Sequence, residues 1–190
     1  QNVALEFLGK TLSYQELWGL ARRFAQGLKD LGVRPGDRVA IMLPNSPQFV
    51  IAFYGTLLAG GVGVNVNPLY TPRELRHQLA DAGAETLVIL DHLLPRYLEV
   101  EKEVPVKRVV VTGIKDFLPF PKNLLYPLKA KRDGLPLGFP KREGFHAFAE
   151  LLKRPPAEPH VPDPEDLALL QYTGGTTGLS KGAMLTHKNL

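Results

Sequence analysis

The sequence lacks cysteine entirely among its 190 residues. This absence excludes disulfide bonds, thiolate metal sites and a cysteine nucleophile. A reducing compartment suits such a chain, so we expect a cytoplasmic location. The chain begins at Gln1 with no basic-then-apolar leader. We therefore expect no signal peptide, and we expect that a further N-terminal piece precedes this sequence.

Charge is missing from one long stretch. No charged side chain occurs from Val39 to Pro72, and 49–64 is almost wholly apolar. A membrane-spanning helix needs about 20 mainly apolar residues in succession. Here Pro44, Pro47 and the glycines between 60 and 63 interrupt the run. We expect a buried strand, helix and strand in this stretch, not a membrane span.

Acidic residues are slightly outnumbered by basic ones. The formal net charge is +4, with a pI near 9.3. Such a balance favours anionic partners such as phosphates, acidic substrates or a membrane surface. The excess is too small to imply a nucleic acid, and we expect none as a partner. The hydrophobic share of 44% is typical of a globular chain.

Helix and strand signals alternate through the first part of the chain. Capping-box patterns occur twice, at Ser13 with Glu16 and at Thr71 with Glu74, each pair being three residues apart. Ser46 precedes a proline that would lie in the first turn of a helix. These signals predict helices that end near 32, 59 and 83. β-rich runs predict strands at 38–43, 62–66, 86–90 and 107–112. This order predicts an α/β fold, a layered and mostly parallel sheet with helices on both faces.

Prolines crowd the segment 113–164, and we expect no regular strand there. Basic and aromatic side chains alternate within 115–145. Two accounts fit this pattern. The aromatics either pin a loop whose basic residues are solvated, or they form a peripheral contact with anionic lipid on the inner face of a membrane. We expect three units: an α/β part at 1–112, this insert at 113–164, and a strand, loop and strand at 165–190.

The segment 172–183 reads YTGGTTGLSKGA and is the candidate phosphate-binding loop. Glycines let backbone N–H groups approach phosphate oxygens, and hydrogen bonds to a charged group contribute about 1.5–3 kcal/mol each. Hydroxyls and a lysine add donors, a metal ligand and positive charge. The candidate residues for binding a polyphosphate are Tyr172, Thr173, Gly174, Gly175, Thr176, Thr177, Gly178, Leu179, Ser180, Lys181, Gly182 and Ala183. A hydroxyl of Thr173, Thr176 or Thr177 is the candidate ligand for a divalent cation. For Tyr172 we favour a packing role at the strand end over direct contact with the ligand.

This loop does not fit the Walker pattern. In that pattern a glycine precedes the lysine, a hydroxyl residue follows it, and a helix begins. Here Ser180 precedes Lys181 and Gly182 follows it, and the next residues predict a strand. The glycine spacing also differs from that of the kinase loop.

The loop resembles the signature of the adenylate-forming superfamily, which closes in Gly-x-Pro-Lys-Gly, with Ser180 where most members carry proline. Two further segments, TLSYQEL at 11–17 and LLAGG at 57–61, resemble structural motifs of that family. The non-proline loop, the continuation GAMLTH at 182–187 and the basic insert look most like bacterial long-chain fatty-acid CoA ligases.

The resemblance implies an acid-thiol ligase that uses ATP, Mg²⁺ and coenzyme A. A fatty acid and ATP would give acyl-adenylate and pyrophosphate, and coenzyme A would then displace AMP. It also implies that this chain is the incomplete N-terminal part of a larger adenylate-forming domain. We expect the isolated chain to be inactive and an open sheet edge to favour homo-oligomers. Two alternatives stay open, a non-catalytic module that binds nucleotide or lipid and an adenylating enzyme for another acid or acceptor.

The five histidines have no metal-like spacing, and we expect surface or capping roles for them. His187 follows the loop most closely and is the one histidine that we would test.

Overall fold

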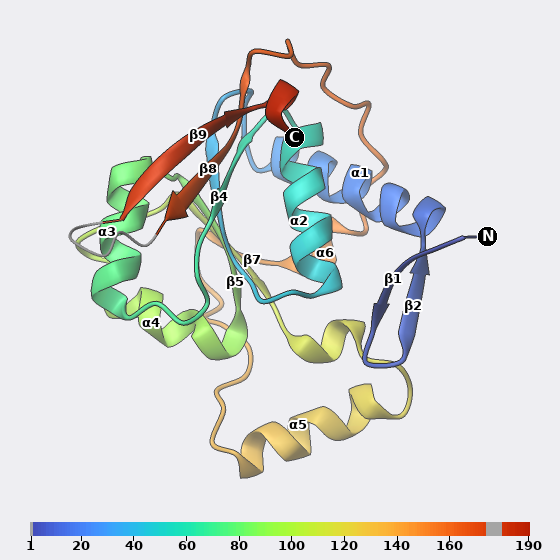
Figure 1. The fold of residues 1–190 in the computed structure, drawn as a ribbon. Helices are drawn as coiled ribbons and strands as arrows, with labels where there is room; N and C mark the ends of the chain where they lie inside the picture. The colour runs from blue at the N-terminus through green and yellow to red at the C-terminus, as the bar shows by residue number, and fades with distance from the viewer. Residues whose placement is uncertain (1, 174–179) are drawn as a thin grey trace.

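The computed structural model describes residues 2–173 and 180–190 (Figure 1). A hairpin of β1 (Val3–Phe7) and β2 (Lys10–Ser13) precedes the main sheet, whose strands are β3 (Arg38–Met42), β4 (Val62–Asn65), β5 (Thr86–Leu90), β6 (Arg108–Thr112), β7 (Phe145–Ala147), β8 (Leu167–Thr173) and β9 (Lys181–Thr186). The helices are α1 (Tyr14–Asp30), α2 (Pro47–Leu58), α3 (Pro72–Ala82), α4 (Leu94–Leu98), α5 (Lys122–Arg132) and α6 (Phe148–Leu151). Short 3₁₀ turns are η1 (Asp91–Leu93), η2 (Ile114–Phe117) and η3 (His187–Asn189).

The main sheet is mostly parallel. Over the described residues its seven strands lie in the order β7-β6-β5-β3-β4-β8-β9, and β9 alone runs antiparallel, to β8. Figure 1 shows α1, α2 and α6 on one face of the sheet and α3 and α4 on the other. The predicted α/β fold is therefore confirmed. Because β8 is parallel to β4, it ends at the carboxyl edge of the sheet, where open α/β sheets bind their ligands.

The two capping boxes form as the sequence predicts. The Ser13 hydroxyl accepts the Glu16 backbone N–H at 3.2 Å, and the Glu16 carboxylate accepts the Ser13 backbone N–H at 2.8 Å. Thr71 and Glu74 repeat the arrangement at α3. The pKa of Glu16 is lowered below its usual value, mainly by the hydrogen bond from the Ser13 backbone and further by that from the Ser13 hydroxyl. The cap therefore holds an ionised glutamate at the helix start, where negative charge is favourable.

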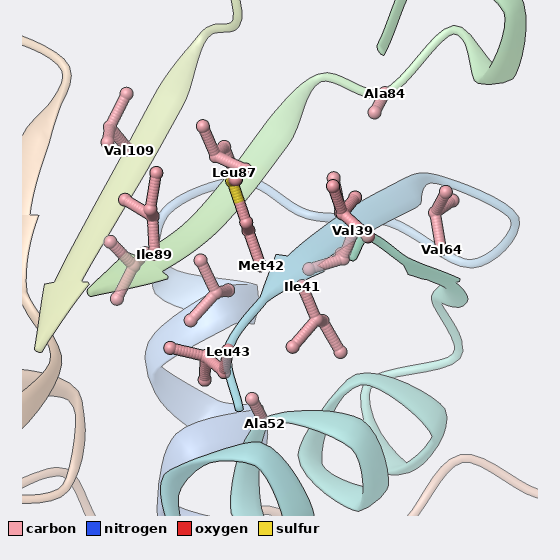
Figure 2. Packing of buried hydrophobic residues seen from close by; sticks show 14 of the residues in the cluster. Val39, Ile41, Met42, Leu43, Ala52, Val64, Ala84, Leu87, Ile89 and Val109 are labelled. Atoms are coloured by element: carbon pink, nitrogen blue, oxygen red, sulfur yellow. The ribbon is translucent and has the colours of Figure 1, made fainter. Parts of the chain in front are cut away.

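The uncharged stretch is buried where α2 packs on the sheet. Figure 2 shows side chains of β3, β5, β6 and α2 gathered in one cluster, among them Ile41, Leu87 and Ala52, which are fully buried. The expected buried strand, helix and strand are thus confirmed as β3, α2 and β4. Among the described residues, no helix combines the length and the apolar character required to cross a bilayer.

The segment 113–164 differs from our expectation. It supplies strand β7, which pairs parallel with β6 through Val109 and Phe145, so the prediction that no regular strand occurs there is wrong. Helix α6 follows and packs on α1, with the Phe24 and Phe148 ring centroids 4.6 Å apart. Proline spacing limits the length of elements, but a three-residue strand fits between the prolines at 140 and 155. The division into units at 112 and 164 stays a prediction.

Helix α1 contacts α6 through a glycine. A Cβ added at Gly27 would lie 2.5 Å from Cβ of Leu151, whereas a Cβ added at Gly19 on the same helix would meet nothing within 4 Å. The close approach of the two helices therefore requires the missing side chain at 27.

We predict opposite effects for alanine at these two glycines. Gly27→Ala forces α6 away from α1 and lowers the free energy of unfolding by about 1–3 kcal/mol. Gly19→Ala raises it by up to about 1 kcal/mol, because alanine favours helix more than glycine does. Urea denaturation measures both. An equal effect of the two substitutions would contradict the packing of α6 on α1.

Candidate functional site

The ends of β8 and β9 form the stem of the candidate loop. In the antiparallel ladder Thr173 lies opposite Lys181, and Tyr172 lies opposite Gly182. The side chains of Thr173, Lys181 and Ala183 are exposed, Ser180 is half-buried, and Tyr172 is buried. The candidates Gly174, Gly175, Thr176, Thr177, Gly178 and Leu179 lie outside the described residues. The predicted strand after the loop is confirmed, since Lys181 begins β9 and not a helix.

Tyr172 joins the stem to helix α3. Its hydroxyl donates a hydrogen bond to Oδ2 of Asp81 at 2.6 Å. On the neighbouring strand, a Cβ at Gly182 would lie 3.0 Å from the Tyr172 ring, so the glycine leaves room for the ring beside the ladder. Burial, together with the bond to Asp81, raises the pKa of Tyr172 well above its usual value. The hydroxyl is therefore a permanent donor, and the ring is part of the packing of the stem.

Helix α3 also reaches the other strand of the stem. Nε2 of His77 lies 3.4 Å from the Ser180 carbonyl oxygen. His77 and Asp81 are four residues apart and so project from the same side of α3. Sequence reasoning missed both residues as parts of the site. The only signal was their i, i+4 spacing, which does not distinguish a contact with a distant loop from a solvated face.

The stem presents features that suit a polyphosphate. Lys181 is exposed, and no ion pair among the described residues involves it. The exposed Thr173 lies directly opposite. A free cation and a hydroxyl at the carboxyl edge of a parallel sheet fit an anionic ligand. Within 2–173 and 180–190, no three His, Asp or Glu side chains form a group that could hold a metal. The Mg²⁺ ligand stays a prediction.

His187 lies away from the loop. β9 separates the two, because Lys181 pairs with Thr173 at the loop end and Thr186 pairs with Leu167 at the opposite end. The His187 backbone N–H donates to the Asp166 carbonyl at 3.0 Å. His187 therefore follows the candidate loop closely in the sequence but lies at the far end of β9 from the described stem residues Thr173 and Lys181.

Comparison with known proteins identifies the family to which the chain belongs. The profile of the AMP-binding enzyme family matches residues 1–190. The chain belongs to the AMP-binding enzyme family. The resemblance that the loop suggested is thereby confirmed.

Several members of this family are close relatives in sequence. A long-chain-fatty-acid–CoA ligase of Bacillus subtilis (strain 168) is 44% identical over 193 residues, which span all of this chain and 34% of the relative. The ligase of the same name from Escherichia coli O157:H7 is 41% identical, over 96% of this chain and 33% of its own. A 4-coumarate-CoA ligase of Narcissus pseudonarcissus is 35% identical over 97% of this chain and 29% of the relative. The chain thus spans about a third of the length of the curated relatives that it matches.

Solved structures of the family share the fold. A long-chain-fatty-acid-CoA ligase from Archaeoglobus fulgidus has a TM-score of 0.74 and 30% identity, over 96% of this chain and 31% of that chain. ATP-bound MatB from Rhodopseudomonas palustris has a TM-score of 0.71 and 29% identity, over 96% of this chain and 31% of that chain. The β8–β9 stem therefore belongs to a fold whose members include an ATP-bound enzyme.

We predict that Tyr172 and Asp81 are energetically coupled. In a double-mutant cycle of Tyr172→Phe and Asp81→Ala, the double variant should lose about 1–2 kcal/mol less free energy of unfolding than the sum of the two single losses. The reason is that each single variant already removes the same charge-assisted hydrogen bond. The free energy of unfolding in urea provides the measurement. Tyr172→Phe keeps the ring against Gly182 and so isolates the hydroxyl. Additive losses would show that the two side chains do not interact in solution.

Proposed function

We propose that this chain is the N-terminal part of an ATP-dependent long-chain fatty acid CoA ligase. In the first step, a carboxylate oxygen of the acid attacks the α-phosphorus of ATP, and pyrophosphate leaves. In the second, the thiol sulfur of coenzyme A attacks the acyl carbon of the adenylate, a thioester forms, and AMP leaves with the bonding electrons.

The observation that supports this proposal most strongly is that nearly the whole chain matches several proteins named long-chain-fatty-acid–CoA ligase. The long-chain ligases of Bacillus subtilis and Haemophilus influenzae are 44% and 43% identical over 100% and 96% of this chain. The ligase for an aromatic acid from Narcissus pseudonarcissus is 35% identical. This ordering favours a long-chain acid, although each of these relatives is about three times as long as this chain.

In this proposal, the stem acts by position and charge. Lys181 and Thr173 bracket the loop 174–179, and together with its backbone N–H groups they bind the β- and γ-phosphates. Bound to these phosphates, the cation and the donors would stabilise the charge that develops on the departing pyrophosphate. A Mg²⁺ ion bound by a hydroxyl of Thr173, Thr176 or Thr177 would neutralise part of that charge. The residues of this chain bind and orient ATP, and none of them acts as a nucleophile.

The alternative is an adenylating enzyme that acts on another acid or uses another acceptor. The chain is 32% identical, with a TM-score of 0.77 over 98% of its length, to MbtA of Mycobacterium smegmatis, and 25% identical to an anthranilate CoA ligase in complex with anthranoyl-AMP. These structures keep open an adenylating enzyme for another acid. A panel of long-chain, short-chain and aromatic acids separates the two, when the full-length protein is tested on each acid with coenzyme A and with a carrier protein as the acceptor.

We further propose that the enzyme is cytoplasmic and meets membranes peripherally. A long-chain fatty acid partitions into bilayers because each buried methylene favours the apolar phase by about 0.8 kcal/mol. A ligase that draws on this pool gains from contact with a membrane surface.

We predict that Lys181→Ala in the full-length protein lowers the rate of fatty-acid-dependent ATP–pyrophosphate exchange by about 10²–10³-fold, as expected for the loss of one preorganised charged donor. Lys188→Ala is the matched control, because Lys188 is an exposed lysine at the other end of β9 and pairs with Glu165. It should change the rate less than about twofold. Exchange by Lys181→Ala at the wild-type rate would contradict the proposed role of the loop. Full activity of the isolated 190-residue chain would instead contradict the expectation that this part alone is inactive.

A further inference from the structure

Helix α5 and the residues that flank it expose an unusual share of apolar side chains. Figure 1 shows it at the bottom of the view, apart from the main sheet. Of the fifteen large apolar side chains that are exposed among the described residues, six fall in 120–137: Phe120, Leu124, Leu125, Leu128, Leu135 and Leu137. An exposed apolar cluster of this kind marks an interaction surface more often than single exposed leucines do.

The leucines of α5 form one stripe on the outer side of the helix. Leu124 and Leu128 are four residues apart and therefore adjacent on one face, and they are 65% and 70% exposed. The opposite side of the helix carries Ala130, which is 1% exposed, and the half-buried Tyr126. α5 thus already buries one face against the protein, and the leucine stripe is additional to it.

Basic side chains border this stripe. α5 contains four of them and no acidic residue: Lys122, Lys129, Lys131 and Arg132. Among the described residues, the only ion pair that involves α5 joins Arg132 to the adjacent Asp133 at 3.5 Å. The ammonium groups of Lys129 and Lys131 are therefore free to meet an external anion, and their position beside leucines is that of an interfacial helix.

A groove of about 380 Å³ lies along α5. Leucine and isoleucine side chains line it together with Tyr126, and two lysines stand at its border, the full lining being Leu8, Ile114, Leu118, Lys122, Leu125, Tyr126 and Lys129. Lys122 also donates to the Leu8 carbonyl at 2.8 Å and so holds α5 to the turn between β1 and β2. The helix is thus tied at its first residue while its leucine stripe remains uncovered.

We propose that α5 is the element that docks the protein on an anionic lipid bilayer, with Leu124 and Leu128 inserted between headgroups and Lys129 and Lys131 at the phosphate level. Charge complementarity favours an anionic bilayer over a second copy of this chain as the partner that covers the leucine stripe. A second copy of this chain would bring the same uncompensated positive charge to the contact, and like charges oppose such pairing. An anionic bilayer instead satisfies the leucines and the lysines at once.

The biological reason for this docking rests on the proposed function, because it would place the enzyme at the pool of its acid. Lipid binding itself does not depend on catalysis. The two proposals can therefore fail separately.

The test is co-sedimentation of the full-length protein with vesicles of phosphatidylcholine alone or with about 30% phosphatidylglycerol. We expect binding to the anionic vesicles that weakens as salt is raised. Leu124→Gln combined with Leu128→Gln should lower the partition coefficient at least tenfold. Lys131→Glu, a change of two charges, should lower it by about fivefold per charge.

The matched control variants make the same kinds of substitution at exposed positions outside α5. Leu69→Gln combined with Val161→Gln replaces side chains that are 80% and 87% exposed, and Lys188→Glu reverses a lysine that lies in η3. These variants should bind like the wild type. Equal losses in the controls and in the α5 variants would overturn the proposal, and so would the absence of binding to anionic vesicles.

Hydrogen exchange identifies what covers the helix. The helical hydrogen bonds of α5 protect its amides in the free protein, so the measured quantity is the change in exchange. Peptides that contain 122–132 should gain further protection when anionic vesicles are added, and their exchange without vesicles should not depend on protein concentration. No gain with vesicles, or a gain that follows protein concentration alone, would show that another part of the protein or a second copy covers α5, and would overturn the proposal. Fatty-acid-dependent exchange of pyrophosphate, measured in detergent, should be unchanged in the α5 variants. Its absence from the wild type together with normal vesicle binding would count against the proposed function alone.

Discussion

Burial of the parallel sheet on both faces is the constraint on which the rest of this structure depends. Strands β3 and β5 are covered from both sides, and Ile41 and Val88 are fully buried. Parallel strands require crossover connections, and these connections place α2 and α6 on one face, where α1 also lies, and α3 and α4 on the other. The carboxyl ends of the parallel strands therefore lie at one edge of the sheet, and β8 delivers the candidate loop to that edge.

Helix α3 turns this general arrangement into a defined stem. It begins at a capping box and ends at Gly83, whose φ of 59° suits glycine. Those two signals fix the helix length and thereby the position of Asp81 under the Tyr172 hydroxyl. A helix that covers the sheet thus also holds the strand that leads into the loop. The packing of α3 on the sheet and the position of the candidate loop therefore depend on the same residues.

The sequence predicts the elements of this fold wherever local chemistry determines them. The capping boxes at Ser13 and Thr71, the buried run from Val39 and the strand after Lys181 are found as expected. β7 was not foreseen, because a strand of three residues has no period of its own and forms only by pairing with β6.

The sequence singles out the candidate loop, because glycine, hydroxyl and lysine residues at that spacing have few other uses, and its role in phosphate binding stays a prediction. The contacts that support the loop could not be predicted from the sequence. The contacts of Tyr172 with Asp81 and of Ser180 with His77 join residues 91 and 103 positions apart, and such pairs depend on topology. The exposed leucines of α5 are a similar case, since the sequence shows leucine and lysine side by side but not which face the protein covers.

A crystal structure of the full-length protein with a non-hydrolysable ATP analogue and Mg²⁺ tests the central claim most directly. The account predicts that the triphosphate lies against residues 173–182, with Lys181 near its oxygens and the bond from Tyr172 to Asp81 intact. A triphosphate bound away from this stem would contradict it.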